Sequence, residues 1–130
     1  MGREMAEVGK LNEGSFIVVN EEPCRIAKMT TSAPGKHGHA KCKLYAVGLF
    51  DGQKRTLVKP SDAKVEIPII ERSTAQILAI MGNSAQLMDL SSYETFELSI
   101  PMELRGELEE GGEVEYIQAL GRKKIERKKS

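Results

Sequence analysis

Apolar and polar residues alternate with a period of two along most of the chain. In residues 40–46 (AKCKLYA) the even positions are apolar, whereas Lys41 and Lys43 occupy odd positions. This alternation predicts a β-strand with one face on a core. Turn-forming residues such as Asp51-Gly52 and Gly82-Asn83 separate such stretches. Besides 40–46, the predicted strands cover residues 14–19, 24–29, 53–58, 64–70, 72–81, 84–90, 93–100 and 113–120.

One short helix is predicted near Pro101 to Leu108. Proline is pre-set for the first position of a helix, and Glu103 suits the positive end of the helix dipole. Helical periodicity is absent elsewhere, so the pattern predicts an all-β fold with one short helix.

The predicted strands form two groups, which suggests two small barrels of about 65 residues each. Pro68 is the natural boundary between them. A single continuous sandwich of nine or ten strands remains an alternative, because no Gly/Ser-rich linker separates the halves.

Length and charge narrow the classes of function. With 130 residues the chain holds one ordinary domain or two very small ones, which excludes large catalytic architectures. Its 19 Lys and Arg balance 19 Asp and Glu, so the chain does not have the overall positive charge that is typical of a general nucleic-acid-binding surface. The two halves differ, however: residues 1–68 carry 11 − 8 = +3, and residues 69–130 carry 8 − 11 = −3. No apolar run is long enough to cross a bilayer, and we expect a cytoplasmic protein without a membrane partner.

The two cysteines, Cys24 and Cys42, are expected to be free thiols packed as small hydrophobic residues. Together with His37 and His39 they offer four ligand atoms, but their spacing matches no known zinc pattern. A Cys42 nucleophile with a histidine base lacks an orienting acid nearby. We therefore predict neither a metal site nor a catalytic site here.

One hairpin is locally positive, because no acidic residue lies between Glu22 and Asp51. Its connection, residues 30–39 (TTSAPGKHGH), is longer than a tight hairpin requires and holds Lys36 near its middle. Gly35 and Gly38 flank this lysine and leave room for another molecule. The loop departs from a phosphate-binding P-loop at Thr30 and His37, and it offers no pocket for a Schiff-base lysine.

Residues 31–41 (TSAPGKHGHAK) resemble the hypusination loop of the translation initiation factor 5A family, in its archaeal form. The Ile67-Pro68 junction and the Gly111-Gly112 turn also resemble that family. The resemblance implies an SH3-like barrel at residues 1–68, which carries the loop, followed by an OB-fold barrel at 69–130.

The resemblance also implies a function. The chain would bind the ribosome near the acceptor end of the peptidyl-tRNA and promote peptide bond formation at stalling sequences such as polyproline. Deoxyhypusine synthase would extend Lys36 with an aminobutyl group from spermidine, and hydroxylation to hypusine could follow. The protein would then be neither an enzyme nor the holder of a cofactor. The other residues of the modification loop would be Pro34, Gly35, His37, Gly38 and His39.

Four basic residues of the hairpin are candidates for RNA phosphate contacts: Arg25, Lys28, Lys41 and Lys43. In contrast, residues 69–121 hold two arginines against ten acidic residues, which disfavours strong RNA binding there. The tail at 122–130 has six bases and one acid, enough to touch phosphate. Two alternatives stay open: a general RNA-binding adaptor without modification, and a small enzyme that uses Lys36 or Cys42.

Overall fold

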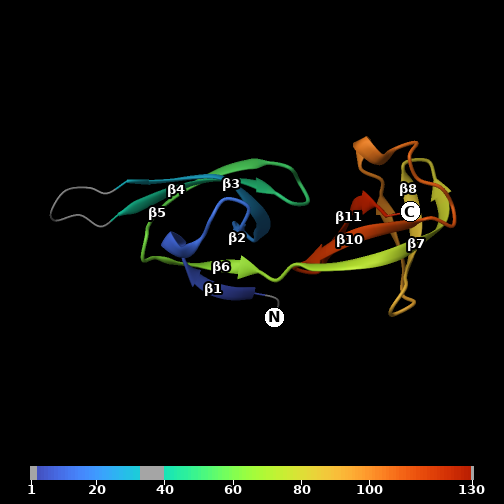
Figure 1. Cartoon of the computed structure of the whole chain (residues 1–130), viewed down its shortest axis with the longest axis horizontal. Helices are drawn as coiled ribbons and strands as arrows, with labels where there is room; N and C mark the ends of the chain where they lie inside the picture. Colours follow the sequence, from blue (N-terminus) through green and yellow to red (C-terminus); the bar gives the residue numbers. More distant parts are fainter. Residues whose placement is uncertain (1–2, 33–39, 130) are drawn as a thin grey trace. The chain divides into compact units, whose positions relative to one another are not determined.

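The computed structural model describes residues 3–32 and 40–129 (Figure 1). The regular secondary structure of this part of the chain is almost all β-strand, as predicted, and the rest of it is two short 3₁₀ turns. The chain divides into two compact units, Met1–Ile69 and Ile70–Ser130, and each has its own hydrophobic core. The two separate cores are inconsistent with one continuous sandwich.

The first unit contains a curled four-stranded sheet with the order β2-β3-β4-β5 and a separate β1–β6 pair, all antiparallel. Alternate residues of β2, β3 and β4 face the core, as the period of two requires. Ile17, Ile26 and Leu44 are at most 1% exposed there. The elements are β1 (Arg3–Glu7), the 3₁₀ turn η1 (Val8–Lys10), β2 (Phe16–Val19), β3 (Glu22–Ser32), β4 (Lys41–Gly48), β5 (Lys54–Pro60) and β6 (Lys64–Pro68).

The second unit contains one curled five-stranded sheet with the order β11-β10-β7-β8-β9. Its core includes Ile77, Leu87, Val114 and Ile125, each at most 1% exposed. The elements are β7 (Glu71–Met81), β8 (Ser84–Asp89), β9 (Thr95–Ser99), the 3₁₀ turn η2 (Met102–Leu104), β10 (Glu113–Ala119) and β11 (Arg122–Lys128).

Two strands and one turn were not predicted from the sequence. β1 and β11 consist largely of charged residues, so their apolar alternation is weak, and η1 is a single turn. The prediction of a basic tail from residue 122 onward is wrong, because residues 122–128 form β11, which pairs with β10 over Val114–Ala119. The predicted short helix is a single 3₁₀ turn, and Gly106, at φ +83°, follows it in a conformation that favours glycine.

A buried carboxylate organises the turn after β8 in the second unit. Asp89 is 6% exposed and accepts hydrogen bonds from the Tyr116 hydroxyl and from the backbone N–H groups of Ser91 and Ser92. The Tyr116 hydrogen bond, with the two backbone bonds, lowers the pKa of Asp89. Burial, together with the hydrogen bond to Asp89, raises the pKa of Tyr116 to about 12.

Among residues 3–32 and 40–129, no helix has both the length and the apolar character needed to span a lipid bilayer.

Candidate functional site

The candidate site is built on the β3–β4 hairpin, whose two strands flank the predicted modification loop. Ser32 at the end of β3 pairs with Lys41 at the start of β4. The carbonyl of Ala40 accepts a hydrogen bond from the Ser61 N–H at 2.8 Å, so the chain that follows β5 supports this arm. The loop residues themselves, Pro34, Gly35, Lys36, His37, Gly38 and His39, lie outside the described residues.

Alternate apolar side chains of β4 pack into the core and hold the hairpin in place. Cys42 and Leu44 of β4 face the core and are at most 1% exposed. The Thr31 hydroxyl lies 3.8 Å from the Cys42 thiol across the strand pair. β5 pairs with β4 from Lys41 to Val47 on the other side. The arm that leads to the loop therefore lies in the part of the four-stranded sheet where only β3, β4 and β5 run side by side.

A bulge in β3 keeps its polar side chains on the outer face. The register shifts between Ile26 and Lys28, so that Ala27 is absorbed as an extra residue. Lys28 then lies opposite Tyr45, and Met29 lies opposite the buried Leu44. Without the bulge, Lys28 would face the core, where an unpaired ammonium is costly.

The four candidate RNA contacts share the outer face of this sheet. Lys41, Lys43 and Tyr45 alternate with the buried residues of β4, and Lys28 pairs with Tyr45. The Nζ atoms of Lys43 and Lys28 lie 5.3 and 5.9 Å from the centre of the Tyr45 ring. Arg25 stacks in the same way on Phe16 of β2, at 5.6 Å. Cation–π contacts of this kind hold a charge in place while leaving it open to solvent.

The sequence analysis did not assign Phe16 and Tyr45 to the site. The sequence pattern indicated Tyr45, because it shares the odd positions of residues 41–45 with Lys41 and Lys43.

A groove of about 330 Å³ lies at the base of the loop and is lined by Thr30, Thr31, Ser32, Lys41, Lys43 and Val58. Hydroxyl and ammonium groups together suit a phosphate or another anion.

Both cysteines are free and buried, as predicted. Burial raises the pKa of the Cys24 thiol, and Arg55 partly offsets this effect from a distance of 3.9 Å. A buried thiol with a raised pKa is a poor nucleophile. Within the described part of the chain, no group of three or more His, Cys, Asp or Glu side chains could hold a metal ion. His37 and His39 lie outside it.

Several basic residues of the second unit are engaged within that unit. Lys123 pairs with Glu94 at 3.3 Å, and Arg127 pairs with Glu115 at 3.0 Å. Arg72, outside the segment 122–130, pairs with Glu126 of β11 at 3.1 Å. The Nζ atom of Lys129 donates to the Thr74 hydroxyl at 2.8 Å. Within the segment expected to touch phosphate, Lys123, Arg127 and Lys129 therefore contact other residues of this unit.

Comparison with known proteins assigns both units. Residues 4–63 match the family model "Translation initiation factor 5A-like, N-terminal", and residues 69–129 match "Eukaryotic elongation factor 5A hypusine, DNA-binding OB fold". Translation initiation factor 5A of Methanothermobacter thermautotrophicus is 54% identical over 129 residues, which are 99% of each chain. The protein of the same name from Archaeoglobus fulgidus is 51% identical over 125 residues, 96% of this chain and 98% of its own. This chain belongs to the translation initiation factor 5A family.

Solved structures confirm the fold of this family member. The eukaryotic translation initiation factor 5A from Methanococcus jannaschii superposes with a TM-score of 0.92 at 47% identity, covering 98% of this chain and 96% of that one. A family protein from Naegleria fowleri gives 0.80 at 26% identity, with both chains fully covered. The resemblance seen in the sequence is thus confirmed, as is the all-β fold with an SH3-like and an OB-fold barrel. The chain is a translation factor.

Proposed function

We propose that this translation factor binds the ribosome near the acceptor end of the peptidyl-tRNA and promotes peptide bond formation at stalling sequences such as polyproline. Membership of the family, whose second model carries the name hypusine, is the observation that carries the proposal. On this proposal, residues 1–68 form the SH3-like domain with the modification loop, and residues 69–130 form the OB-fold domain.

The proposed active group is a deoxyhypusine or hypusine side chain on Lys36. Deoxyhypusine synthase transfers the aminobutyl part of spermidine to the Lys36 nitrogen. A new C–N bond forms there, the C–N bond between the two parts of spermidine breaks, and diaminopropane leaves. The product is a long side chain with two cations, which can lie along phosphates where an ordinary lysine is too short.

The remaining loop residues, Pro34, Gly35, His37, Gly38 and His39, form the segment that the synthase recognises. Gly35 and Gly38 leave space beside the lysine for the enzyme and later for the tRNA.

The outer face of the hairpin supplies the positioning contacts in this proposal. Arg25, Lys28, Lys41 and Lys43 bind backbone phosphates, which fixes orientation without reading sequence. The stacking of Lys28 and Lys43 on Tyr45 supports this role, because pre-ordered side chains lose less entropy on binding. The factor then acts in the cytoplasm, where its ribosomes are, and assists chemistry by orienting the substrates without catalysing a reaction itself.

The proposal predicts that Lys36→Arg abolishes stimulation of polyproline synthesis while the fold stays intact. Arginine keeps one charge but does not accept the aminobutyl group. The measurement is the yield of a polyproline reporter in a translation system from the native host, with thermal unfolding as the check on folding. Lys64→Arg, an exposed site on β6, is the matched control and should retain full activity. Retained activity of Lys36→Arg would favour the alternative, an RNA-binding adaptor that works without modification.

A further inference from the structure

One edge of β3 is open beside the loop. β2 pairs with β3 only from Glu22 to Arg25, whereas β3 continues to Ser32. In the described ranges 3–32 and 40–129, the part of β3 beyond the Ala27 bulge pairs with β4 alone. The end of β3 next to the loop is therefore an edge strand.

The backbone groups of this edge are partly covered and partly available. The Ile26 N–H donates to the Ser15 carbonyl at 2.8 Å. After the bulge, the Met29 N–H donates to a carboxylate oxygen of Glu13 at 3.2 Å. Alternate residues of a strand direct their backbone groups to the same edge, so the N–H and C=O of Thr31 point the same way. For these two groups no hydrogen-bond partner is found in the described part of the chain.

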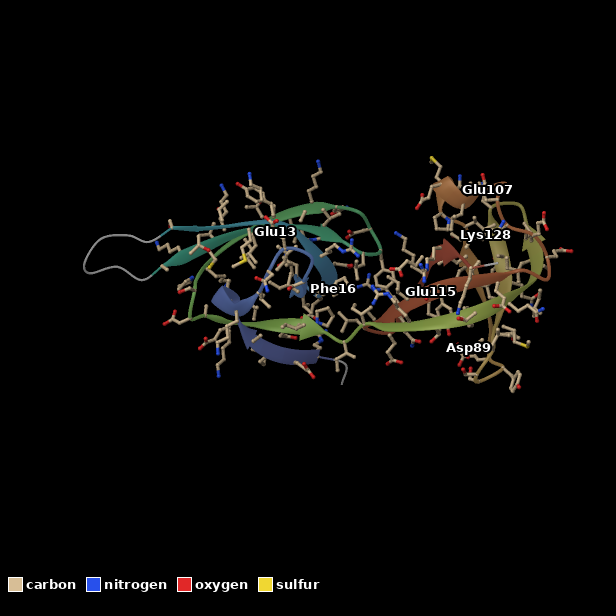
Figure 2. All side chains as sticks on the ribbon, in the orientation of Figure 1. Glu13, Phe16, Asp89, Glu107, Glu115 and Lys128 are labelled. Atoms are coloured by element: carbon tan, nitrogen blue, oxygen red, sulfur yellow. The ribbon has the colours of Figure 1, made fainter. Side chains whose placement is uncertain are left out.

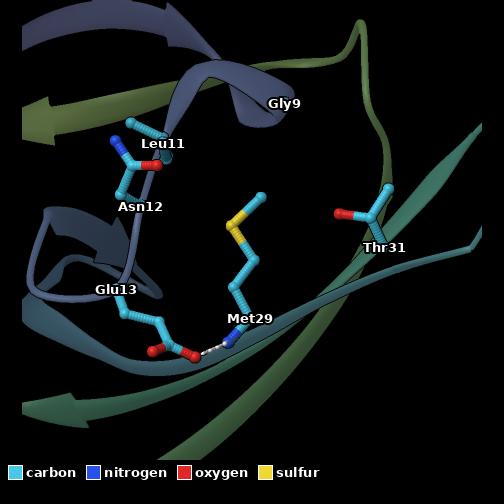
Figure 3. Close-up of a pocket in the computed structure, with 6 residues that line it drawn as sticks. All are labelled: Gly9, Leu11, Asn12, Glu13, Met29 and Thr31. Atoms are coloured by element: carbon cyan, nitrogen blue, oxygen red, sulfur yellow. Dashed lines mark hydrogen bonds between the residues drawn. The ribbon is translucent and has the colours of Figure 1, made fainter.

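A groove of about 510 Å³ runs along this edge (Figure 3). Met29 directs its thioether into the groove between the segment of Leu11, Asn12 and Glu13 and the strand at Thr31 (Figure 3). The lining combines an adaptable thioether with a carboxylate, a carboxamide and a hydroxyl group. Such a lining suits the side chains and backbone of an extended peptide.

This edge of β3 lacks the residues that usually prevent an edge strand from pairing with another chain. Edge strands are commonly blunted by lysine, proline or an inward-pointing charge. Residues 29–32 are Met-Thr-Thr-Ser, without a charge or a proline, and threonine favours strand conformation. One carboxylate oxygen of Glu13 accepts the hydrogen bond from the Met29 N–H that a carbonyl of a neighbouring strand would otherwise accept. The Glu13 side chain is itself exposed to solvent.

We propose that an extended segment of a partner protein adds to β3 as a further strand at Met29–Thr31. A carbonyl of the segment replaces Glu13 at the Met29 N–H, and the Thr31 groups gain partners. The released Glu13 carboxylate then pairs with a lysine or arginine of the segment. The inference rests on the proposed function, in which this partner is deoxyhypusine synthase. A protein that receives the loop lies against the strand that leads into it, whereas RNA offers no strand to complete the sheet.

The test is steady-state modification of the full chain by its synthase with spermidine, for a pair of variants at one position. Thr31→Pro removes the N–H that faces the open edge, and proline is tolerated at such edge positions. Thr31→Val is the matched control: it also loses the hydroxyl but keeps the N–H. We expect Thr31→Pro to raise KM for the protein substrate about tenfold with kcat unchanged, and Thr31→Val to stay within about twofold of the original chain.

A second variant tests the ionic part of the contact. Glu13→Gln keeps an acceptor for Met29 but removes the charge. We expect KM to rise about threefold, and the difference from the original chain to disappear at high salt. An unchanged KM would overturn the pairing of Glu13 with a cation.

Hydrogen exchange of the unaltered chain gives a measurement that no folding defect can affect. The Thr31 amide should exchange rapidly in the free protein and slowly in the complex with the synthase. Equal KM values for Thr31→Pro and Thr31→Val, or an unprotected amide in the complex, would overturn the inference. Failure of the original chain to be modified at all would instead overturn the proposed function.

Discussion

At the scale of single residues, Tyr45 and Asp89 show how polar groups are held in the two units. Tyr45 provides one ring for two ammonium groups that remain in solvent. Asp89, which is labelled in Figure 2, belongs to the second unit. It is buried, and its charge is satisfied by a hydroxyl and two N–H groups. The first arrangement suits binding, because its charges stay available to a partner. The second suits stability, because a buried carboxylate without partners would be costly.

The lowered pKa of Asp89 makes the stability of the second unit dependent on pH. A carboxylate whose pKa is lower in the folded state stabilises the fold above its ordinary value of 3.8. That contribution is lost as the pH falls below 3.8 toward the pKa of the folded state. At neutral pH we expect Asp89→Asn to lower the free energy of unfolding by about 1–3 kcal/mol.

Urea unfolding across a pH series checks this expectation. The difference between the original chain and Asp89→Asn should be constant above about pH 5 and shrink below pH 3.8. Glu97→Gln, an exposed change on β9, is the control and should show no such loss. A difference that stays constant down to pH 2 would show that Asp89 contributes through shape and not through charge.

At the scale of elements, the sequence predicted the strands whose apolar residues alternate and missed those built from charged residues. β4 alternates cleanly between exposed and buried positions. β11 contains one buried residue, Ile125, among six charged ones. β1 contains no buried residue, since only Ala6 and Glu7 are partly buried. Charged side chains are typical of outer strands, so these strands depend on pairing that no local pattern reveals. The bulge at Ala27 is likewise set by tertiary packing.

The assignment of 122–128 to a barrel strand gives a direct prediction. Ile125 is fully buried, so Ile125→Ala should destabilise the protein by about 2–5 kcal/mol, through lost burial and the cavity left behind. The measurement is the urea midpoint of unfolding. Lys128→Ala on the same strand is exposed and should change stability by less than about 0.5 kcal/mol. Equal, small effects of both changes would mean that this segment behaves as a solvated tail.

The outer face of the hairpin predicts a change in salt dependence. Each lysine that contacts a phosphate contributes about 0.7–0.9 to the slope of log K against log salt concentration. The double change Lys28→Ala and Lys43→Ala should therefore weaken binding to ribosomes and reduce this slope by about 1.5. The matched control is Lys10→Ala with Lys64→Ala, two exposed lysines away from this face. Equal slopes for the two double variants would remove this face from the binding surface.

At the scale of the whole molecule, charge is divided between the two halves of a chain that is neutral overall. Residues 1–68 carry the surplus of bases, whereas in the acidic second half Arg72, Lys123 and Arg127 pair with carboxylates of that half. The β3–β4 hairpin that leads into residues 33–39 carries four exposed bases, Arg25, Lys28, Lys41 and Lys43. Modification of Lys36 is a prediction from the sequence alone, through the resemblance of residues 31–41 to the hypusination loop, and it stays a prediction because Lys36 lies outside the described residues. Its strand support and the stacked lysines required the fold.

The most direct test of the account is the mass of the intact protein isolated from its native host, followed by fragmentation to locate any modification. The account predicts one aminobutyl increment, with or without an additional oxygen, on Lys36 and on no other lysine. Active protein with an unmodified Lys36 would contradict it.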